Sequence, residues 1–256
     1  MQSDTLIEAR MIRRGAAAAA LADGPASAFG ELEPERVFRI RSADSTVVRS
    51  AANDLIRERY SWRGYHAVSL PSDQTTNRIT LSATEKDEII GTITVALDGP
   101  DGLSADDAFP EEMAELRARG HRVCEFTKLA IDPISGSQRV LAALFHVAYI
   151  VAYRMRGNDT LVMEVNPRHV RYYERMVGAR VLGGERLNRF VNAPAVLLSV
   201  PFSYIRDQLE ATHGDHAHPL NTDERSIYPY TFSKREEAGI VGRLMAAQKP
   251  VSASIN

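Results

Sequence analysis

Residues 124–178 read CEFTKLAIDPISGSQRVLAALFHVAYIVAYRMRGNDTLVMEVNPRHVRYYERMVG, and this stretch decides the fold. Its opening, CEFTKLAID, predicts a β-strand that ends at Asp132-Pro133. In residues 135–157, apolar side chains recur at helical spacing as far as Gly157. The second segment therefore predicts a long helix with an apolar face.

The block continues with a second strand and a second helix. The segment TLVMEVN, residues 160–166, is apolar at almost every position, as expected of a strand in the middle of a sheet that is covered on both faces. The following NPRHVRYYERMVGA has a proline just inside a helix start, and we expect the helix to end at Gly178. The order strand, helix, strand, helix predicts an α/β fold.

Further elements flank this block on both sides. Their periodicity and punctuation predict two strands that form a hairpin, a strand and a helix before them, a short helix after them, and one last strand. The corresponding ranges are a strand at 37–41, a helix at 43–60, hairpin strands at 78–84 and 89–97, a helix from 110, and a strand at 195–200. In SKRE, Ser233 and Glu236 form a capping box that predicts a final helix as far as Ala247.

Alternation assigns the side chains of the first strand to two faces. It predicts one face with Glu125, Thr127 and Leu129, and the opposite face with Phe126, Lys128 and Ala130. Glu125 and Lys128 then point apart, unless a β-bulge in the strand brings both to the same side.

The segments CEFTKLAID, VNPRHVRYYERMVGA, APAVLLSVPF and RERYSWRGY together resemble the FeeM type of long-chain N-acyl amino acid synthases. That family is part of the GNAT acyltransferase superfamily and is related to the acyl-homoserine lactone autoinducer synthases. The resemblance covers roughly residues 36–202. It implies a GNAT-like mixed sheet, splayed at its centre and flanked by helices. It also implies transfer of a fatty acyl group from acyl carrier protein to the amine of an amino acid.

Amide formation from a thioester needs a base for the ammonium, donors for the oxyanion and a proton for the thiolate. Glu125 is the candidate base, because a carboxylate on a central strand is costly unless it is paired or functional. A buried ion pair is the alternative. The related families carry a basic residue at the position of Lys128. Backbone N–H groups near Leu129 to Ile131 are the candidate oxyanion donors. Tyr173 is the candidate proton donor, with Tyr172 as the alternative.

Three polar residues follow the second central strand, where ligands of open α/β sheets bind. Arg168 would hold the substrate carboxylate, with Asn166 and His169 beside it. Alternatively, Asn166 caps the helix and Arg168 is a solvated charge. Trp62 and Tyr65 lie in RERYSWRGY, a segment that folds over the substrates in the resembled families, and they suit a substrate-binding lid or the core.

The loop expected to bind the acyl donor differs from the usual pattern of the superfamily. The loop before the long helix, Ser135 to Arg139, has one glycine where coenzyme A enzymes have a glycine-rich pyrophosphate loop. This favours acyl carrier protein as donor, with acyl-CoA as the alternative co-substrate and no tightly bound cofactor. Two other functions remain open, namely an acetyl-CoA-dependent N-acetyltransferase and a non-catalytic module that binds acyl thioesters.

The amino-acid composition excludes several classes of protein. A net charge of -2 with interspersed charges gives no footprint for nucleic acid. Cys124 is the only cysteine, so no internal disulfide forms, which suits a cytoplasmic protein, and we expect it in the core. No apolar run reaches the length of a membrane span. We expect no metal site in the histidine-bearing loop 213–218, and we expect His146 to be a core residue.

Three regions result. Residues 1–35 are expected to be a helical or disordered N-terminal arm, residues 36–202 the acyltransferase domain, and residues 203–256 a C-terminal extension with a loop and a helix. Because the extension directly follows the last predicted strand, we expect it to close the acyl tunnel.

Overall fold

The computed structural model describes residues 5–10, 36–61, 68–70, 77–212 and 226–248. Its strands form one mixed sheet in the order β1-β2-β3-β4-β5-β6-β8-β7. The strands are β1 Thr5–Arg10, β2 Val37–Ser42, β3 Arg78–Glu85, β4 Glu88–Leu97, β5 Val123–Ile131, β6 Thr160–Val165, β7 Arg180–Asn188 and β8 Ala193–Pro201. Neighbouring strands are antiparallel except β5 and β6, which are parallel. The predicted α/β, GNAT-like mixed sheet is confirmed.

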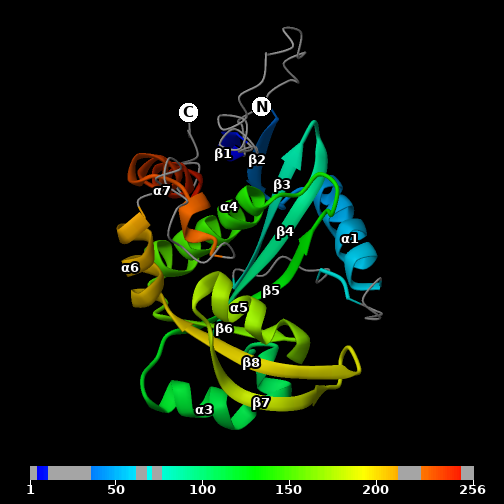
Figure 1. The fold of residues 1–256 in the computed structure, drawn as a ribbon, viewed down its shortest axis with the longest axis vertical. Helices are drawn as coiled ribbons and strands as arrows, with labels where there is room; N and C mark the ends of the chain where they lie inside the picture. The colour runs from blue at the N-terminus through cyan, green and yellow to red at the C-terminus, as the bar shows by residue number, and fades with distance from the viewer. Residues whose placement is uncertain (1–4, 11–35, 62–67, 71–76, 213–225, 249–256) are drawn as a thin grey trace, which may run out of the picture.

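Helices flank the sheet (Figure 1). The α-helices are α1 Thr46–Ser61, α2 Ala105–Ala108, α3 Pro110–Ala118, α4 Gln138–Tyr149, α5 Val170–Val177, α6 Phe202–Thr212 and α7 Lys234–Gln248. The π-helical segment η2, Ile150–Met155, continues α4, and η3, Pro167–His169, and η4, Tyr228–Tyr230, are short 3-10 turns. Ser137 caps α4 by accepting a hydrogen bond from the backbone N–H of Val140 at 3.2 Å.

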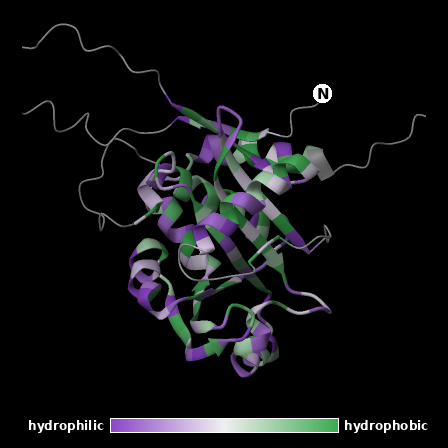
Figure 2. Ribbon diagram, turned by 90° about the vertical axis from the view of Figure 1, so that its right-hand side faces the viewer, coloured by the Kyte–Doolittle hydropathy of each residue, from purple (hydrophilic) through white to green (hydrophobic). Residues whose placement is uncertain are grey.

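One face of the sheet packs against α4 to α7 in a single apolar cluster. Every residue of α4 except Gln138 is buried, so this helix is surrounded on all sides. Burial of each large apolar side chain contributes roughly 1.5–3 kcal/mol. Figure 2 shows the apolar residues gathered on the strands and on the adjoining helix surfaces.

The opposite face is divided. One apolar cluster lies under α2 and α3 and includes Phe109 and Met113. A second, smaller cluster lies under α1 and includes Ile56 and Ala130. Side chains of β3, β4 and β5 that are polar and nonetheless buried share this face, among them Thr80, Thr94 and Glu125.

The sheet opens at its centre. β5 and β6 pair from Val123 and Thr160 to Glu125 and Val162, and no further pair joins these strands within the described residues. Figure 1 shows β6, β8 and β7 turning away from β3, β4 and β5. This is the splay that the family resemblance implied.

A β-bulge interrupts β5 just past this point. Thr94 faces Thr127 and Thr92 faces Ala130, so Lys128 and Leu129 together oppose one residue of β4. Lys128 has φ 51°, a left-handed conformation that is uncommon outside glycine. The bulge that the sequence left open is confirmed. The simple alternation is wrong beyond it, because Leu129 packs against the same cluster as Phe126.

Residues 5–10 correct the expectation for the N-terminal arm. They form β1, an edge strand paired with β2, whereas we expected a helical or disordered segment. Ile7 and Ala9 are buried, and Arg39 donates to Glu8 across the pair at 2.7 Å. The pairing supplies backbone partners that an isolated arm would lack.

One further strand and two helices depart from the expected pattern. The predicted first helix begins three residues later, at Thr46, and β7 and α6 were not predicted. The capping box is confirmed, since the backbone N–H of Ser233 donates to Glu236 at 2.8 Å and the N–H of Glu236 donates to the Ser233 hydroxyl at 3.4 Å. Gly178 ends α5 with φ 75°, as expected.

Candidate active site

Glu125 lies at the last paired position before β5 and β6 separate. Its side chain is 1% exposed, and Oε2 accepts a hydrogen bond from the backbone N–H of Ser104 at 2.8 Å. Burial raises the pKa of Glu125 to about 7, and the negative charge of Glu164 adds to this rise. The carboxyl group is therefore poised to exchange a proton near neutral pH.

Lys128 is the second candidate on this strand. The bulge brings its charge within electrostatic range of Glu125, while its backbone carbonyl accepts from the Thr92 hydroxyl at 3.0 Å. Burial lowers the pKa of Lys128, and the nearby charge of Arg78 lowers it further. Within the residues that the structure describes, the ammonium of Lys128 makes no hydrogen bond or close ion pair.

Arg78 belongs to the same face by strand register. Arg78 pairs with Ala96, and Ala96 pairs with Glu125, so the three residues form one row across β3, β4 and β5. Ala96, the middle residue of this row, has a small side chain. In the next row the hydroxyls of Thr80 and Thr94 are 2.9 Å apart and share a hydrogen bond. We call Arg78, Thr80, Thr94, Glu125 and Lys128, together with Glu164 of β6, the polar strip.

Glu164 was missed in the sequence. It follows Val162, the partner of Glu125, by two residues and so lies on the same face of β6. Asn188 donates to its Oε1 at 2.6 Å, whereas burial and the charge of Asp107 raise the pKa of Glu164. The signal was present as a single charge within an otherwise apolar strand, TLVMEV.

Tyr172 and Tyr173 on α5 point to different surroundings. Tyr173 is half-buried against the apolar cluster of the α4 face, whereas Tyr172 is 39% exposed. Their rings meet edge to face with centroids 5.4 Å apart. Of the two phenols, that of Tyr173 lies on the buried side of the helix.

The residues after β6 take mostly local roles. Asn166 caps η3 by accepting from the backbone N–H of Arg168 at 3.2 Å, as the alternative interpretation of this residue stated. The side chain of Arg168 is exposed, and that of His169 is half-buried. These three residues lie at the splayed end of β6, while Leu129 and Ile131 pack against the α4-side cluster from β5.

The loop before α4 is shaped by close packing. A Cβ atom at Gly136 would lie 2.3 Å from the carbonyl oxygen of Asp132, so this turn requires glycine. Arg139 is 4% exposed and donates to the carbonyl oxygens of Tyr230 and Thr231 in the C-terminal extension, the latter at 2.8 Å. Its guanidinium also lies 4.9 Å from the ring centre of Phe232.

The same extension also binds the middle of α4. The backbone N–H of Phe232 donates to Nδ1 of His146 at 3.0 Å, and Nε2 of His146 lies 3.4 Å from Glu237. His146 is therefore a core residue, as expected. Further along, the hydroxyl of Tyr228 donates to the carbonyl oxygen of Val177 at 2.8 Å.

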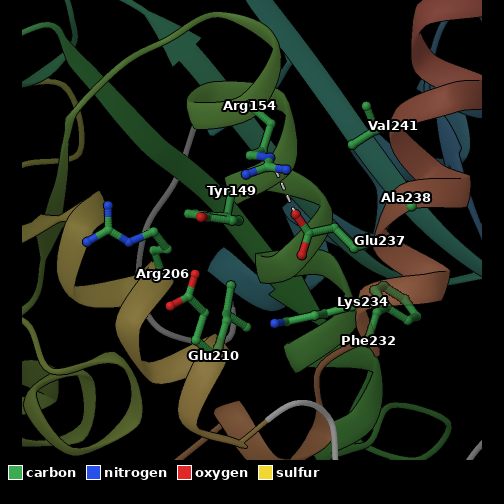
Figure 3. A pocket seen from close by; sticks show the side chains of 10 residues that line it. Tyr149, Arg154, Arg206, Glu210, Phe232, Lys234, Glu237, Ala238 and Val241 are labelled. Atoms are coloured by element: carbon green, nitrogen blue, oxygen red, sulfur yellow. Dashed lines mark ion pairs between the residues drawn. The ribbon is translucent and has the colours of Figure 1, made fainter.

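Two cavities lie between α4, α6 and the extension. The inner one holds only about 10 Å³ of free space. Its lining is mostly apolar and comprises Phe126, Phe145, His146, Tyr149, Val177, Ile205, Leu209, Ile227, Tyr228 and Thr231. The outer one holds about 370 Å³ and shares Tyr149 and Leu209 with the inner one. Figure 3 shows Arg206 and Glu210 of α6 facing Lys234 and Glu237 of α7 across it.

Some predicted positions lie outside the described residues, namely Trp62, Tyr65 and the loop 213–218. Within the described residues, no cluster of three side chains suited to a metal occurs. In that same part of the chain, the helices are too short or too polar to cross a bilayer. Cys124 is buried and carries a free thiol.

One solved structure supports the fold, and two others are less similar. The structure of FeeM, an N-acyl amino acid synthase from uncultured soil microbes, matches with a TM-score of 0.58 and 23% identity over 67% of this chain and 94% of FeeM. The acyl-homoserine lactone synthase LasI matches at 0.46 and 14%, over 65% and 90% of the two chains. A putative N-acetyltransferase from Lactobacillus plantarum matches at 0.45 and 19%, over 64% and 98%. No curated protein matches.

A family model gives the assignment. The model described as N-acyl amino acid synthase FeeM matches residues 51–201, which is more than half of the chain and includes all of β3 to β8. The matched range includes the splay, Glu125, Lys128 and Tyr173. The chain is thus an N-acyltransferase that belongs to the FeeM family of N-acyl amino acid synthases.

Proposed function

We propose that this enzyme transfers a long-chain fatty acyl group from acyl carrier protein to the amine of an amino acid. The observation that carries the proposal is Glu125, a buried carboxyl group with a pKa of about 7 beside the opening between β5 and β6. Such a group can take a proton from an ammonium near neutral pH. We place the reaction in the cytoplasm, in keeping with the free thiol of Cys124.

The proton inventory is simple. The ammonium of the acceptor gives one proton to the Glu125 carboxylate, and the free amine attacks the thioester carbonyl carbon. A C–N bond forms, and the C–S bond breaks as the tetrahedral intermediate collapses. The nitrogen then loses a second proton, and the departing thiolate gains one. The net products are an amide, a free thiol and one proton released to solvent through Glu125.

The two substrates would approach from opposite faces of the sheet. Glu125 belongs to the face of the polar strip, whereas Tyr173 and the inner cavity belong to the α4 face. Because β5 and β6 are unpaired beyond Glu125, the amine and the thioester can meet in the gap between them. Backbone N–H groups near Leu129 to Ile131 border this gap and are our candidates for binding the oxyanion.

Tyr173 is our candidate donor to the thiolate. Its half-buried position on the α4 face suits a group that meets the donor, whereas the exposed Tyr172 is less suited. A phenol can supply the proton that the leaving sulfur needs. Asn166, Arg168 and His169 stand at the mouth of the same gap and remain candidates for contacting the substrates. Trp62 and Tyr65, which lie outside the described residues, remain candidates from the sequence alone.

The loop before α4 supports carrier protein as the donor. In this loop Gly136 is needed for the turn, and Arg139 is already bound to the carbonyl groups of Tyr230 and Thr231. Arg139 is therefore committed within the protein and is not free to pair with the pyrophosphate of coenzyme A. A phosphopantetheine arm lacks that pyrophosphate charge and needs no such cation.

The acyl chain would enter the inner cavity. It begins at Phe126, next to Glu125, and its far wall comes from Ile205, Leu209 and Tyr228 of the C-terminal extension. With about 10 Å³ free, the cavity must widen by side-chain movement to admit a chain. The extension then acts as the end wall and sets the chain length.

The test is a product analysis by mass spectrometry. Purified enzyme is incubated with the twenty amino acids and, in parallel, with palmitoyl-acyl carrier protein, palmitoyl-coenzyme A and acetyl-coenzyme A. We expect a long-chain N-acyl amino acid from the carrier-protein donor. Acetylated product alone would replace the proposal with an N-acetyltransferase, and bound thioester without any product would indicate a non-catalytic binding module.

A further inference from the structure

The polar strip carries charges that the proposed reaction has not yet used. Glu125 and Glu164 bring two carboxyl groups to the gap from neighbouring strands, and Lys128 and Arg78 bring two cations to the same face. An isolated charge on a half-buried strand face is costly, and like charges side by side raise that cost. The arrangement therefore favours a ligand that carries both signs.

The cations are the clearest part of this pattern. In the described portion of the chain, neither the Lys128 ammonium nor the Arg78 guanidinium has a hydrogen-bonded or ion-paired side-chain partner. Buried cations elsewhere in this protein are bound, as Arg139 is by two carbonyl groups. An anion between Lys128 and Arg78 would remove their mutual repulsion and supply hydrogen-bond acceptors to both.

The carboxyl groups complement the cations. Glu125 is bound on one oxygen by the Ser104 N–H, and Glu164 is bound on one oxygen by Asn188. The negative charges of Glu125 and Glu164 repel each other, which is one reason that the pKa of Glu125 is raised. A cation between them would lower that repulsion, as the ammonium of an acceptor does before it gives up its proton.

We propose that Glu164 and Arg78 complete the acceptor site, so that the amino acid binds as a zwitterion across the polar strip, with its ammonium between Glu125 and Glu164 and its carboxylate on Lys128 and Arg78. This assignment rests on the proposed function and adds two binding residues, Glu164 and Arg78, that lie on β6 and β3. It predicts that simple amines, which lack the carboxylate, are poor acceptors.

The first test needs no variant. The best acceptor among the twenty amino acids is compared with its own primary carboxamide in kcat/KM. We expect the acid to be favoured by about 10- to 100-fold, the range of charge-assisted hydrogen bonds. Because the amine of the carboxamide is less basic, kcat/KM is expressed per unprotonated amine for both acceptors, and a ratio near one on that scale would overturn the assignment. That failure leaves the proposed function intact, whereas absence of any acylated amino acid refutes the function itself.

Variants then separate the two halves of the site. Arg78→Met and Lys128→Met should each reduce the preference for acid over carboxamide by about tenfold. Glu164→Gln should lower kcat/KM for both acceptors by a similar factor and leave their ratio unchanged, because both carry the amine. The exposed pair Arg171→Met and Glu174→Gln on α5 are matched controls. An equal loss on both acceptors in Arg78→Met and Lys128→Met, at unchanged melting temperature, would also overturn the carboxylate assignment.

Discussion

The two faces of the central sheet bury charged groups in opposite ways. On the α4 face, Arg139 is bound by carbonyl groups of the C-terminal extension, and His146 is bound by Phe232 and Glu237. On the other face, Lys128 has no such partner in the described residues, and Glu125 is bound by backbone N–H groups, that of Ser104 donating to Oε2.

This difference distinguishes buried polar groups that stabilise the fold from buried charges that gather at a functional site. A buried polar group that is bound by other segments of the same chain stabilises one arrangement of that chain. A buried charge that is incompletely bound lowers stability unless a ligand completes it, and such groups gather at functional sites. The apolar clusters agree with this division, because the α4 face has one continuous core whereas the other face has two cores on either side of the polar strip.

The largest effect should come from Glu125→Gln. We expect kcat to fall by about 10²- to 10⁴-fold, the range for loss of a general base, with the fold intact because the amide oxygen can still accept from Ser104. Steady-state kinetics and circular dichroism measure the two properties together. The surface substitution Glu174→Gln serves as control. Unchanged turnover would make Glu125 a structural residue like those of the α4 face.

A second prediction concerns pH. If Glu125 is the base, kcat/KM should fall about tenfold for each pH unit below about 7, where the carboxyl group is protonated. The free energy of unfolding should depend on pH in the opposite direction. Because the pKa of Glu125 is raised in the folded protein, its contribution is present below about 4.5 and is lost as pH rises through about 7.

Both pH dependences are measured in parallel. One series follows kcat/KM, and the other follows the free energy of unfolding in urea. Glu125→Gln should lack the stability component that wild type loses between about 4.5 and 7. A flat pH profile of kcat/KM in wild type would contradict a base with this pKa. Tyr149 and Tyr228, whose burial raises their pKa values, titrate well above this window.

Local periodicity predicted most of the fold. The strands β5 and β6 and the helix α4 follow from spacing in one continuous block, whereas the bulge was only an alternative to regular alternation. β1 escaped notice because six residues with three polar ones carry little signal until they pair with β2. β7 escaped because register shifts at Gly183 break its alternation.

The sequence predicted candidate site residues that are close together in the chain. It did not predict those that only strand pairing brings together. Glu125 and Lys128 lie in one motif, so the family resemblance indicated both, although regular alternation would point them apart. Arg78 and Glu164 join them only through the register of β3, β4, β5 and β6, which no local pattern gives. The available signal was the polar alternation of RITLSATE and EIIGTITVAL, two strands whose serine and threonine residues are buried.

The smallest effect on catalysis should come from the α4 face, where Arg139→Met tests the other half of the comparison. Methionine removes the donors to the carbonyl groups of Tyr230 and Thr231 and leaves them unsatisfied, so we expect a loss of about 2–4 kcal/mol of unfolding free energy. Turnover of a short acyl donor should change less than about threefold, because no reacting atom meets this side chain. Arg171→Met on exposed α5 should alter neither quantity. If Arg139→Met abolished turnover with coenzyme A donors while stability held, Arg139 would be a phosphate-binding residue, and the bound cation of this face would be functional after all.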